Sequence, residues 1–155
     1  MSGNVGWSAK QGLPARAGSY VLVLYLARTA RLRIGRLGRF DFPAGWYLYV
    51  GSARGPGGLA ARVGRHLRSS ANPHWHIDYL RRVATVEEVW WREGVERREC
   101  EWAQAIGGWT GAKIIAPRFG ASDCECKTHL WWVRTNSFDI RSIIACTLEK
   151  PDVRY

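Results

Sequence analysis

Two side chains suited to phosphate binding, an arginine and a histidine, follow a glycine-rich stretch at positions 55–58. Arg62 and His66 stand four positions apart, so in a helix they would lie on the same face. A glycine-rich loop lets the backbone approach a ligand, and a guanidinium can donate a pair of hydrogen bonds to phosphate. Gly64 costs such a helix about 1 kcal/mol relative to alanine, which predicts that substrate or another helix passes close to it. A solvated basic helix face would give the same pattern.

Tyrosines precede the same stretch in two apolar runs. Tyr20 lies near the start of the run at 19–26, and Tyr49 lies in the run at 46–50 that leads into the glycine-rich loop. Tyrosine is common in strands for structural reasons alone. It can accept a proton in catalysis only where a nearby cation or metal lowers its pKa. The role of each phenol therefore depends on what lies beside it.

Two glutamates, Glu99 and Glu101, lie in a predicted helix at 96–106. A magnesium ion takes few protein carboxylates and keeps several of its waters. One such glutamate, together with an arginine, could hold and neutralise a phosphodiester. Acidic residues in a first turn also interact favourably with the helix dipole, so an ordinary structural interpretation stands beside the chemical one.

Histidines and cysteines supply further types of metal ligand. His74, His76 and Asp78, in the sequence H-W-H-I-D-Y, could ligate a metal or contact phosphate, and His76 could also cap or pack a helix. Cys124, Cys126 and His129 have the spacing C-x-C-x-x-H, which is not the paired C-x-x-C of a structural zinc site. A zinc site built on them would take one of the histidines at 74 and 76 as its fourth ligand.

The composition indicates one globular domain that interacts with a polyanion. The chain has 155 residues, of which 46% are hydrophobic, and it carries a formal charge of +10. A charge of this size attracts polyanions, nucleic acid first among them, although a basic solvated surface would give the same number. No apolar run approaches the length of a membrane span, so no membrane partner is expected. No secretory signal precedes the cysteines, which predicts reduced thiols in a cytoplasmic protein.

Hydrophobic periodicity predicts an α+β fold, an α/β sandwich in which a small mixed β-sheet is flanked by about three helices. The expected strands are 19–26, 31–34, 39–42, 46–50, 86–91 and 129–133, and the expected helices are 59–68, 76–83 and 96–106. The segments at 31–34 and 39–42 predict an extra β-hairpin. Residues 1–16 are expected to form a flexible leader and 17–133 the domain, and 134–155 form an extension whose signals are too mixed to assign.

The order of these motifs resembles the GIY-YIG nuclease superfamily. Gly18-Ser19-Tyr20 is similar to its "GIY" element, and Tyr49-Val50-Gly51 is similar to its "YIG" element. Arg62, with His66 one turn later, resembles the arginine and histidine of the helix that follows. Glu99 resembles the metal-binding glutamate of the superfamily. Three separated signatures in the right order make this a specific match over residues 18–106.

The resemblance extends to about residue 133. The stretches H-W-H-I-D-Y at 74–79 and F-G-A-S-D-C-x-C-x-x-H-L at 119–130 are similar to a small, poorly characterised branch of the superfamily. Members of that branch occur alone or fused to DNA-repair glycosylase domains. The sequence departs from compact members by Ser19 in the first element and by the hairpin between the two tyrosines. Neither departure removes a catalytic group.

The resemblance implies a metal-dependent endonuclease that hydrolyses phosphodiester bonds, in DNA first of all. Its implied catalytic residues are Tyr20, Tyr49, Arg62, His66 and Glu99, and its implied substrate-binding residues are Gly51, Ser52, Arg54, Arg65, His74 and His76. Glu99 would bind one Mg²⁺ or Mn²⁺, with Glu101 as the second choice. Arg62 would stabilise charge on the phosphate, Tyr20 would activate the water, and His66 would orient it or relay a proton.

The sequence is also compatible with functions of two other classes. A non-catalytic nucleic-acid-binding module would explain the charge and the architecture, because a fold does not by itself confer chemistry. A zinc-stabilised interaction domain would use the cysteines and histidines in place of the glutamates. No pattern indicates an oligomeric state.

Overall fold

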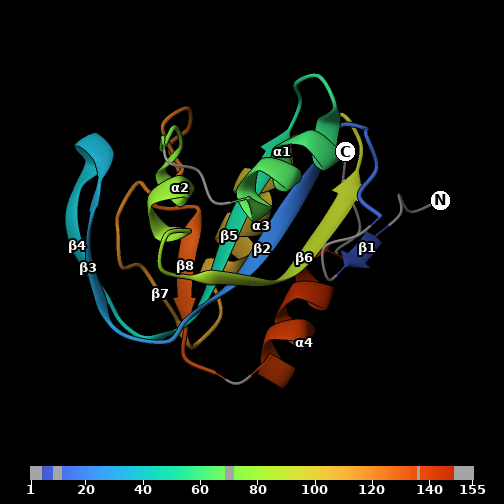
Figure 1. The fold of residues 1–155 in the computed structure, drawn as a ribbon. Coiled ribbons are helices and arrows are strands. Elements are labelled where there is room, and N and C mark those ends of the chain that lie inside the picture. Colours follow the sequence, from blue (N-terminus) through green and yellow to red (C-terminus); the bar gives the residue numbers. More distant parts are fainter. Residues whose placement is uncertain (1–4, 9–11, 69–71, 136, 149–155) are drawn as a thin grey trace.

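The computed structural model of the chain describes residues 5–8, 12–68, 72–135 and 137–148, and it confirms an α+β fold (Figure 1). A six-stranded sheet has the order β1-β6-β2-β5-β8-β7, and β3 and β4 form a separate two-stranded sheet. The strands are β1 Val5–Ser8, β2 Gly18–Leu26, β3 Ala30–Ile34, β4 Gly38–Phe42, β5 Gly45–Ala53, β6 Thr85–Glu93, β7 Ala112–Lys113 and β8 Leu130–Val133. The helices are α1 Gly58–Leu67, α2 His76–Leu80, α3 Glu99–Gly107 and α4 Ser137–Leu148, with a short 3₁₀ turn at Gly35–Leu37.

Strand β2 is one of the two central strands of the sheet, and it pairs with β5 on one side and with β6 on the other. Its apolar run is buried except at Tyr25, as expected of a strand that lies between two helical layers. Every strand pairing in the described part of the chain is antiparallel, where the sequence predicts a mixed sheet. The reason is that β5 and β6 run in the same direction but are separated by β2.

Helices cover both faces of the sheet (Figure 1). Successive residues of a strand point to opposite faces, so β2 contributes to two cores. Leu22 and Leu24 pack in the core that contains residues of α1 and α2, whereas Val21 and Val23 pack in the core that contains residues of α3 and α4. None of the described helices has the length and hydropathy that crossing a membrane requires.

Both ends of the described chain are more ordered than the sequence predicts. Val5–Ser8, inside the expected leader, forms the edge strand β1 and pairs with β6. Residues 137–148, which the sequence leaves unassigned, form α4 and bury Ile140 and Leu148 in the core shared with α3. Arg92 Nη1 donates to the carbonyl oxygen of Leu148 at 3.1 Å. The extension therefore contributes to the core through α4.

The hairpin of β3 and β4 stands away from the main sheet, beside α2 (Figure 1). The structure confirms the hairpin that the sequence predicts between the two tyrosine-bearing strands. Its alternating pattern exposes Arg31, Arg33 and Arg39 and buries Ile34 and Phe42. The hairpin is thus held by a buried apolar end and presents arginines to solvent.

Candidate active site

A cavity of about 370 Å³ lies where β2, β5, α1 and α3 approach one another. It is lined by Tyr20 from β2, Tyr49 from β5, Arg62 from α1 and Glu99 from α3. Three of the expected substrate-binding residues, Gly51, Ser52 and Arg54, also line it. Residues from four separate segments of the chain therefore converge on one space.

The two phenols reach the cavity because β2 and β5 are paired in a particular register. Tyr20 lies opposite Gly51, and Leu22 lies opposite Tyr49, so both tyrosines point to the same face of the sheet. A Cβ at Gly51 would lie 2.5 Å from the ring carbon Cζ of Tyr20. Only a glycine at this position leaves room for the Tyr20 ring.

The hydroxyl of Tyr20 is hydrogen-bonded to the imidazole of His66. The two groups are 2.8 Å apart, from Oη to Nε2, and each residue is 1% exposed. Burial raises the pKa of Tyr20 well above its ordinary value and lowers the pKa of His66 to about 4. Both groups are therefore neutral at pH 7. In that state Tyr20 donates, Nε2 accepts, and the ring proton of His66 is on Nδ1.

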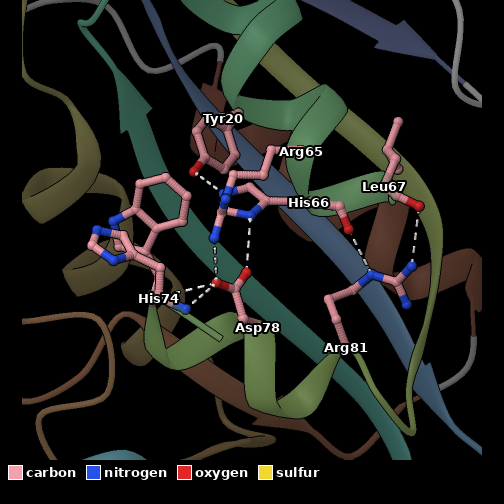
Figure 2. Close-up of polar contacts among 8 residues, drawn as sticks. Tyr20, Arg65, His66, Leu67, His74, Asp78 and Arg81 are labelled. Carbon is pink, nitrogen blue, oxygen red and sulfur yellow. Dashed lines mark hydrogen bonds and ion pairs between the residues drawn. The ribbon is translucent and has the colours of Figure 1, made fainter. Parts of the chain in front are cut away.

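Asp78 lies on the far side of the same imidazole (Figure 2). One carboxylate oxygen is 4.0 Å from His66 Nδ1. The other accepts hydrogen bonds from the backbone N–H groups of His74 at 2.7 Å and Trp75 at 2.9 Å, and from Arg65 Nη2 at 3.1 Å. Burial by itself would raise the pKa of Asp78, but these donors outweigh it and the pKa is lowered. Asp78 therefore carries its charge beside the neutral His66.

The C-terminal end of α1, which carries His66, is fixed by one arginine. Arg81 donates from Nε to the carbonyl oxygen of His66 at 2.7 Å and from Nη2 to that of Leu67 at 3.3 Å (Figure 2). The last carbonyls of a helix have no partner within the helix, so such donors stabilise its end. The position of the imidazole is set by α1 and by its neighbours on both sides.

Arg62 is oriented by an aromatic ring. Its guanidinium carbon lies 4.5 Å from the centre of the Trp75 ring, and that of Arg65 lies at the same distance from the same ring. Stacking on a ring uses the face of the guanidinium and leaves its N–H donors in the plane. Arg62 can therefore direct those donors toward an anion in the cavity that Trp75 also lines.

Glu99 and Asp123 are the two acidic residues that line the cavity, and Glu99 is the one that the sequence motifs indicate. Its Oε2 is buried and has no hydrogen-bond partner in the described part of the chain. A buried carboxylate oxygen without a partner is unfavourable, and a divalent cation with water ligands would satisfy it. Glu101, the second choice on the sequence, is exposed and does not line the cavity, because two positions along a helix turn a side chain to about the opposite face.

A second cavity of about 790 Å³ lies between α2 and the hairpin. Its lining includes Arg31, Arg33, Arg36, His74, His76, Tyr79 and Arg82. His74 and His76, expected to bind substrate, thus border this basic cavity and not the one with the phenols. His76 Nδ1 also accepts a hydrogen bond from the backbone N–H of Gly120 at 2.8 Å. Trp75, between the two histidines, lines the first cavity, so one short segment borders both.

A cluster of sulfur and nitrogen ligands lies at the wall of the same cavity as Glu99, which Cys100, Cys124 and His129 also line. The ligand atoms of Cys100, Cys124, Cys126 and His129 all lie within 4.8 Å of one another, so the cluster could hold a metal ion. The fourth member of the cluster is Cys100 from α3, where the sequence predicts His74 or His76. The prediction was wrong because α3 brings a cysteine from across the fold, and no spacing along the chain indicates that contact.

The family model described as "Domain of unknown function DUF123" matches residues 19–150. The chain belongs to the DUF123 family. The match includes α4 as well as every residue named in the two cavities. A search of curated proteins and a search of solved structures returned no significant match.

Two other expectations about this DUF123 chain change with the structure. Arg65, expected to bind substrate, is paired with the buried Asp78. Gly64 has no described atom within 4 Å of where a Cβ would lie, so no neighbouring helix explains a glycine there. The sequence also missed Trp75 and Asp78 as parts of one arrangement with His66. Both residues lie in the stretch H-W-H-I-D-Y, which was the available signal. The neighbouring sequence does not indicate that this stretch contacts α1.

Proposed function

We propose that this DUF123 domain is a metal-dependent endonuclease of the GIY-YIG type that hydrolyses phosphodiester bonds in DNA. The observation that supports it best is the shared cavity of Tyr20, Tyr49, Arg62 and Glu99. The GIY-YIG resemblance implies the same four residues from sequence motifs alone. A chance resemblance gives no reason for them to meet. A positive charge of +10 favours a nucleic acid as the substrate.

Glu99 would hold one Mg²⁺ or Mn²⁺ through its unpartnered oxygen. The cavity is open to water and carries only two carboxylates among its lining residues, Glu99 and Asp123, which suits an ion that retains most of its waters. The ion would supply Lewis-acid stabilisation of charge on the scissile phosphate and on the leaving oxygen. This cation takes oxygen ligands and is distinct from any ion in the cysteine cluster.

Arg62 would bind the scissile phosphate. Its stacking on Trp75 restricts the guanidinium before substrate arrives, so less conformational entropy is lost on binding. Donors already in place where negative charge grows in the transition state lower the barrier without further reorganisation.

Tyr20 would take the proton of the attacking water. Because burial disfavours a phenolate, we propose that Tyr20 passes its own proton to His66 Nε2 along the existing hydrogen bond as it accepts one from water. The water becomes the nucleophile, Tyr20 stays neutral, and the positive charge appears on His66. Asp78 would stabilise that imidazolium from the Nδ1 side.

The second cavity would guide the rest of the nucleic acid. Its arginines and the exposed face of the hairpin form a basic surface. The segment at 74–76 borders both cavities, so a backbone bound along the hairpin could continue to Arg62. Contacts of this kind position the substrate without reading its sequence.

The test is incubation of the purified chain with labelled single-stranded, duplex and branched DNA in Mg²⁺ or Mn²⁺. We expect cleavage of at least one substrate and its complete loss in a chelator. Intact DNA under every condition would contradict the proposal. Binding that persists in chelator without any cleavage would instead support a non-catalytic nucleic-acid-binding module.

A further inference from the structure

The cysteine–histidine cluster has the composition of a structural zinc site. Three thiols and one imidazole supply four protein ligands, and zinc sites of the Cys₃His type are tetrahedral and closed to substrate. Soft thiolate ligands favour zinc over magnesium or calcium, which prefer oxygen. Cys100, Cys124 and His129 line the same cavity as Glu99, but their sulfur and nitrogen atoms differ in chemistry from its carboxylate oxygens.

The distances within the cluster suit a tetrahedral ion. Zinc lies about 2.3 Å from sulfur and about 2.0 Å from nitrogen, which places the nitrogen of a tetrahedral site about 3.5 Å from each sulfur. His129 Nε2 is 3.5 Å from Cys124 Sγ and 3.9 Å from Cys100 Sγ. These two distances are near the required separation, and the remaining ligand atoms lie within 4.8 Å of one another, so small side-chain movements would close the shell.

The backbone around the cluster is fixed by hydrogen bonds that do not involve the ligand atoms. Arg118 N donates to the carbonyl oxygen of Lys127 at 2.6 Å, and Arg118 Nη1 donates to that of Cys126 at 2.7 Å. His129 N donates to the Phe119 carbonyl oxygen at 2.8 Å. These hydrogen bonds close the loop at 118–129 and fix the backbone that carries Cys126 and His129.

We propose that Cys100, Cys124, Cys126 and His129 bind one zinc ion that fastens α3 to the loop at 118–129. Cys100 follows Glu99 directly in α3, and the carbonyl oxygen of His129 accepts a hydrogen bond from Val50 N at 2.9 Å. Val50 in turn follows Tyr49. The ion would thus hold two walls of the cavity, and this role stands whether or not the cavity cleaves DNA.

The direct test is the metal content of the full chain, expressed with zinc and purified without chelator. We expect about one zinc per chain by elemental analysis. Cys124→Ser and Cys126→Ser should lose most of it. Cys146→Ser is the matched control, because Cys146 is an exposed cysteine on α4 outside the cluster, and it should retain the full amount. Glu99→Gln should also retain zinc.

Wild-type protein provides a second measurement that does not depend on the folding of a variant. Replacement of zinc by cobalt should give the visible d–d bands of a tetrahedral ion and a thiolate-to-metal charge-transfer band. Titration with a mercurial thiol reagent should release the zinc. The proposal would be overturned by zinc-free protein that gives no cobalt spectrum. It would also be overturned by a disulfide among these cysteines in reducing buffer, or by a loss of zinc in Cys146→Ser equal to that in the cluster variants.

Discussion

Tyr20 combines a buried, neutral hydroxyl with a hydrogen bond to a neutral imidazole, and this pair lies at the centre of the proposed chemistry. Neither group alone is a strong base at pH 7, because burial raises the pKa of Tyr20 and lowers that of His66 to about 4. Together they can move a proton without forming a buried phenolate. The charge that results lies next to Asp78, which is why we assign Asp78 as a positioning residue for His66.

Asp78→Asn should slow the reaction more than it weakens substrate binding. The amide keeps the size of the side chain but removes the negative charge that faces His66 Nδ1. We expect kcat to fall about 10²-fold with little change in KM. Steady-state cleavage assays would measure both constants, with Asp139→Asn on α4 as the control. A matching rise in KM with unchanged kcat would show that Asp78 serves substrate binding instead.

Burial of neutral His66 should make the protein less stable in mild acid. The pKa of His66 is about 4 in the folded protein and about 6.5 in an unfolded chain, so the unfolded state takes up protons first as the pH falls. The contribution of neutral His66 to the free energy of unfolding is present in full above pH 6.5 and is lost as the pH falls toward 4. Between pH 7 and pH 5 the loss is about 2 kcal/mol.

Urea unfolding at pH 7 and pH 5 would measure this loss. The control is His66→Gln, which has no titrating ring and should lose about 2 kcal/mol less between the two pH values. Equal losses for the two proteins would contradict the assignment of a neutral, buried His66.

Among the secondary-structure elements, the pair β2 and β5 determines how the two tyrosines of the proposed active site are placed. Tyr20 and Tyr49 share a face because of the register that sets Tyr20 opposite Gly51. The glycine of the YIG-like motif is required by the ring that crosses it, since a Cβ would come within 2.5 Å of Tyr20. The motif is therefore explained by packing between neighbouring strands.

Gly51→Ala should displace the Tyr20 ring and break its hydrogen bond to His66. We expect a loss of about 1–3 kcal/mol in the free energy of unfolding, as for other overpacked cores, and cleavage slower by about 10²-fold. Gly64→Ala is the matched control. It adds a methyl group in an open helical position and should raise stability by up to about 1 kcal/mol without loss of activity. Equal activity in both variants would contradict this role of Gly51.

The elements that the sequence predicted well are those with strong local patterns. The apolar run of β2 and the alternation of the hairpin can be recognised from neighbours along the chain. α4 was unassigned because its burial depends on a distant sheet face, and Val5–Ser8 becomes a strand only because β6 offers an edge. The partners of Cys100 and Asp78 were missed for the same reason. Each acquires its partners through tertiary contacts that no local spacing encodes.

At the scale of the whole molecule, four arginines gather around the second cavity: Arg31, Arg33, Arg36 and Arg82. The hairpin and α2 enclose this cavity, next to the segment that borders the candidate active site. Removal of one exposed arginine from this surface should weaken nucleic-acid binding without affecting the chemistry of the cavity.

Arg33→Ala and Arg36→Ala should each weaken binding to duplex DNA and reduce its dependence on salt. Loss of one phosphate contact lowers the slope of log K against log salt by about 0.9. Fluorescence anisotropy in chelator, at several salt concentrations, would measure the slope in the absence of cleavage. Arg134→Ala is the control, because this exposed arginine lines a different cavity near α4. If Arg33→Ala and Arg36→Ala had the same slope as the control Arg134→Ala, the nucleic acid would not bind along the second cavity.

The central claim is that Glu99, in the cavity with Tyr20 and Arg62, makes this protein a metal-dependent nuclease. The most direct measurement is the cleavage rate of labelled DNA in Mg²⁺ by Glu99→Gln and Glu101→Gln, the same substitution at two positions of α3 that are separated by one residue. We predict that Glu99→Gln slows cleavage by about 10²–10³-fold and that Glu101→Gln, whose side chain is exposed outside the cavity, leaves the rate unchanged. Cleavage by Glu99→Gln at the wild-type rate would contradict the account.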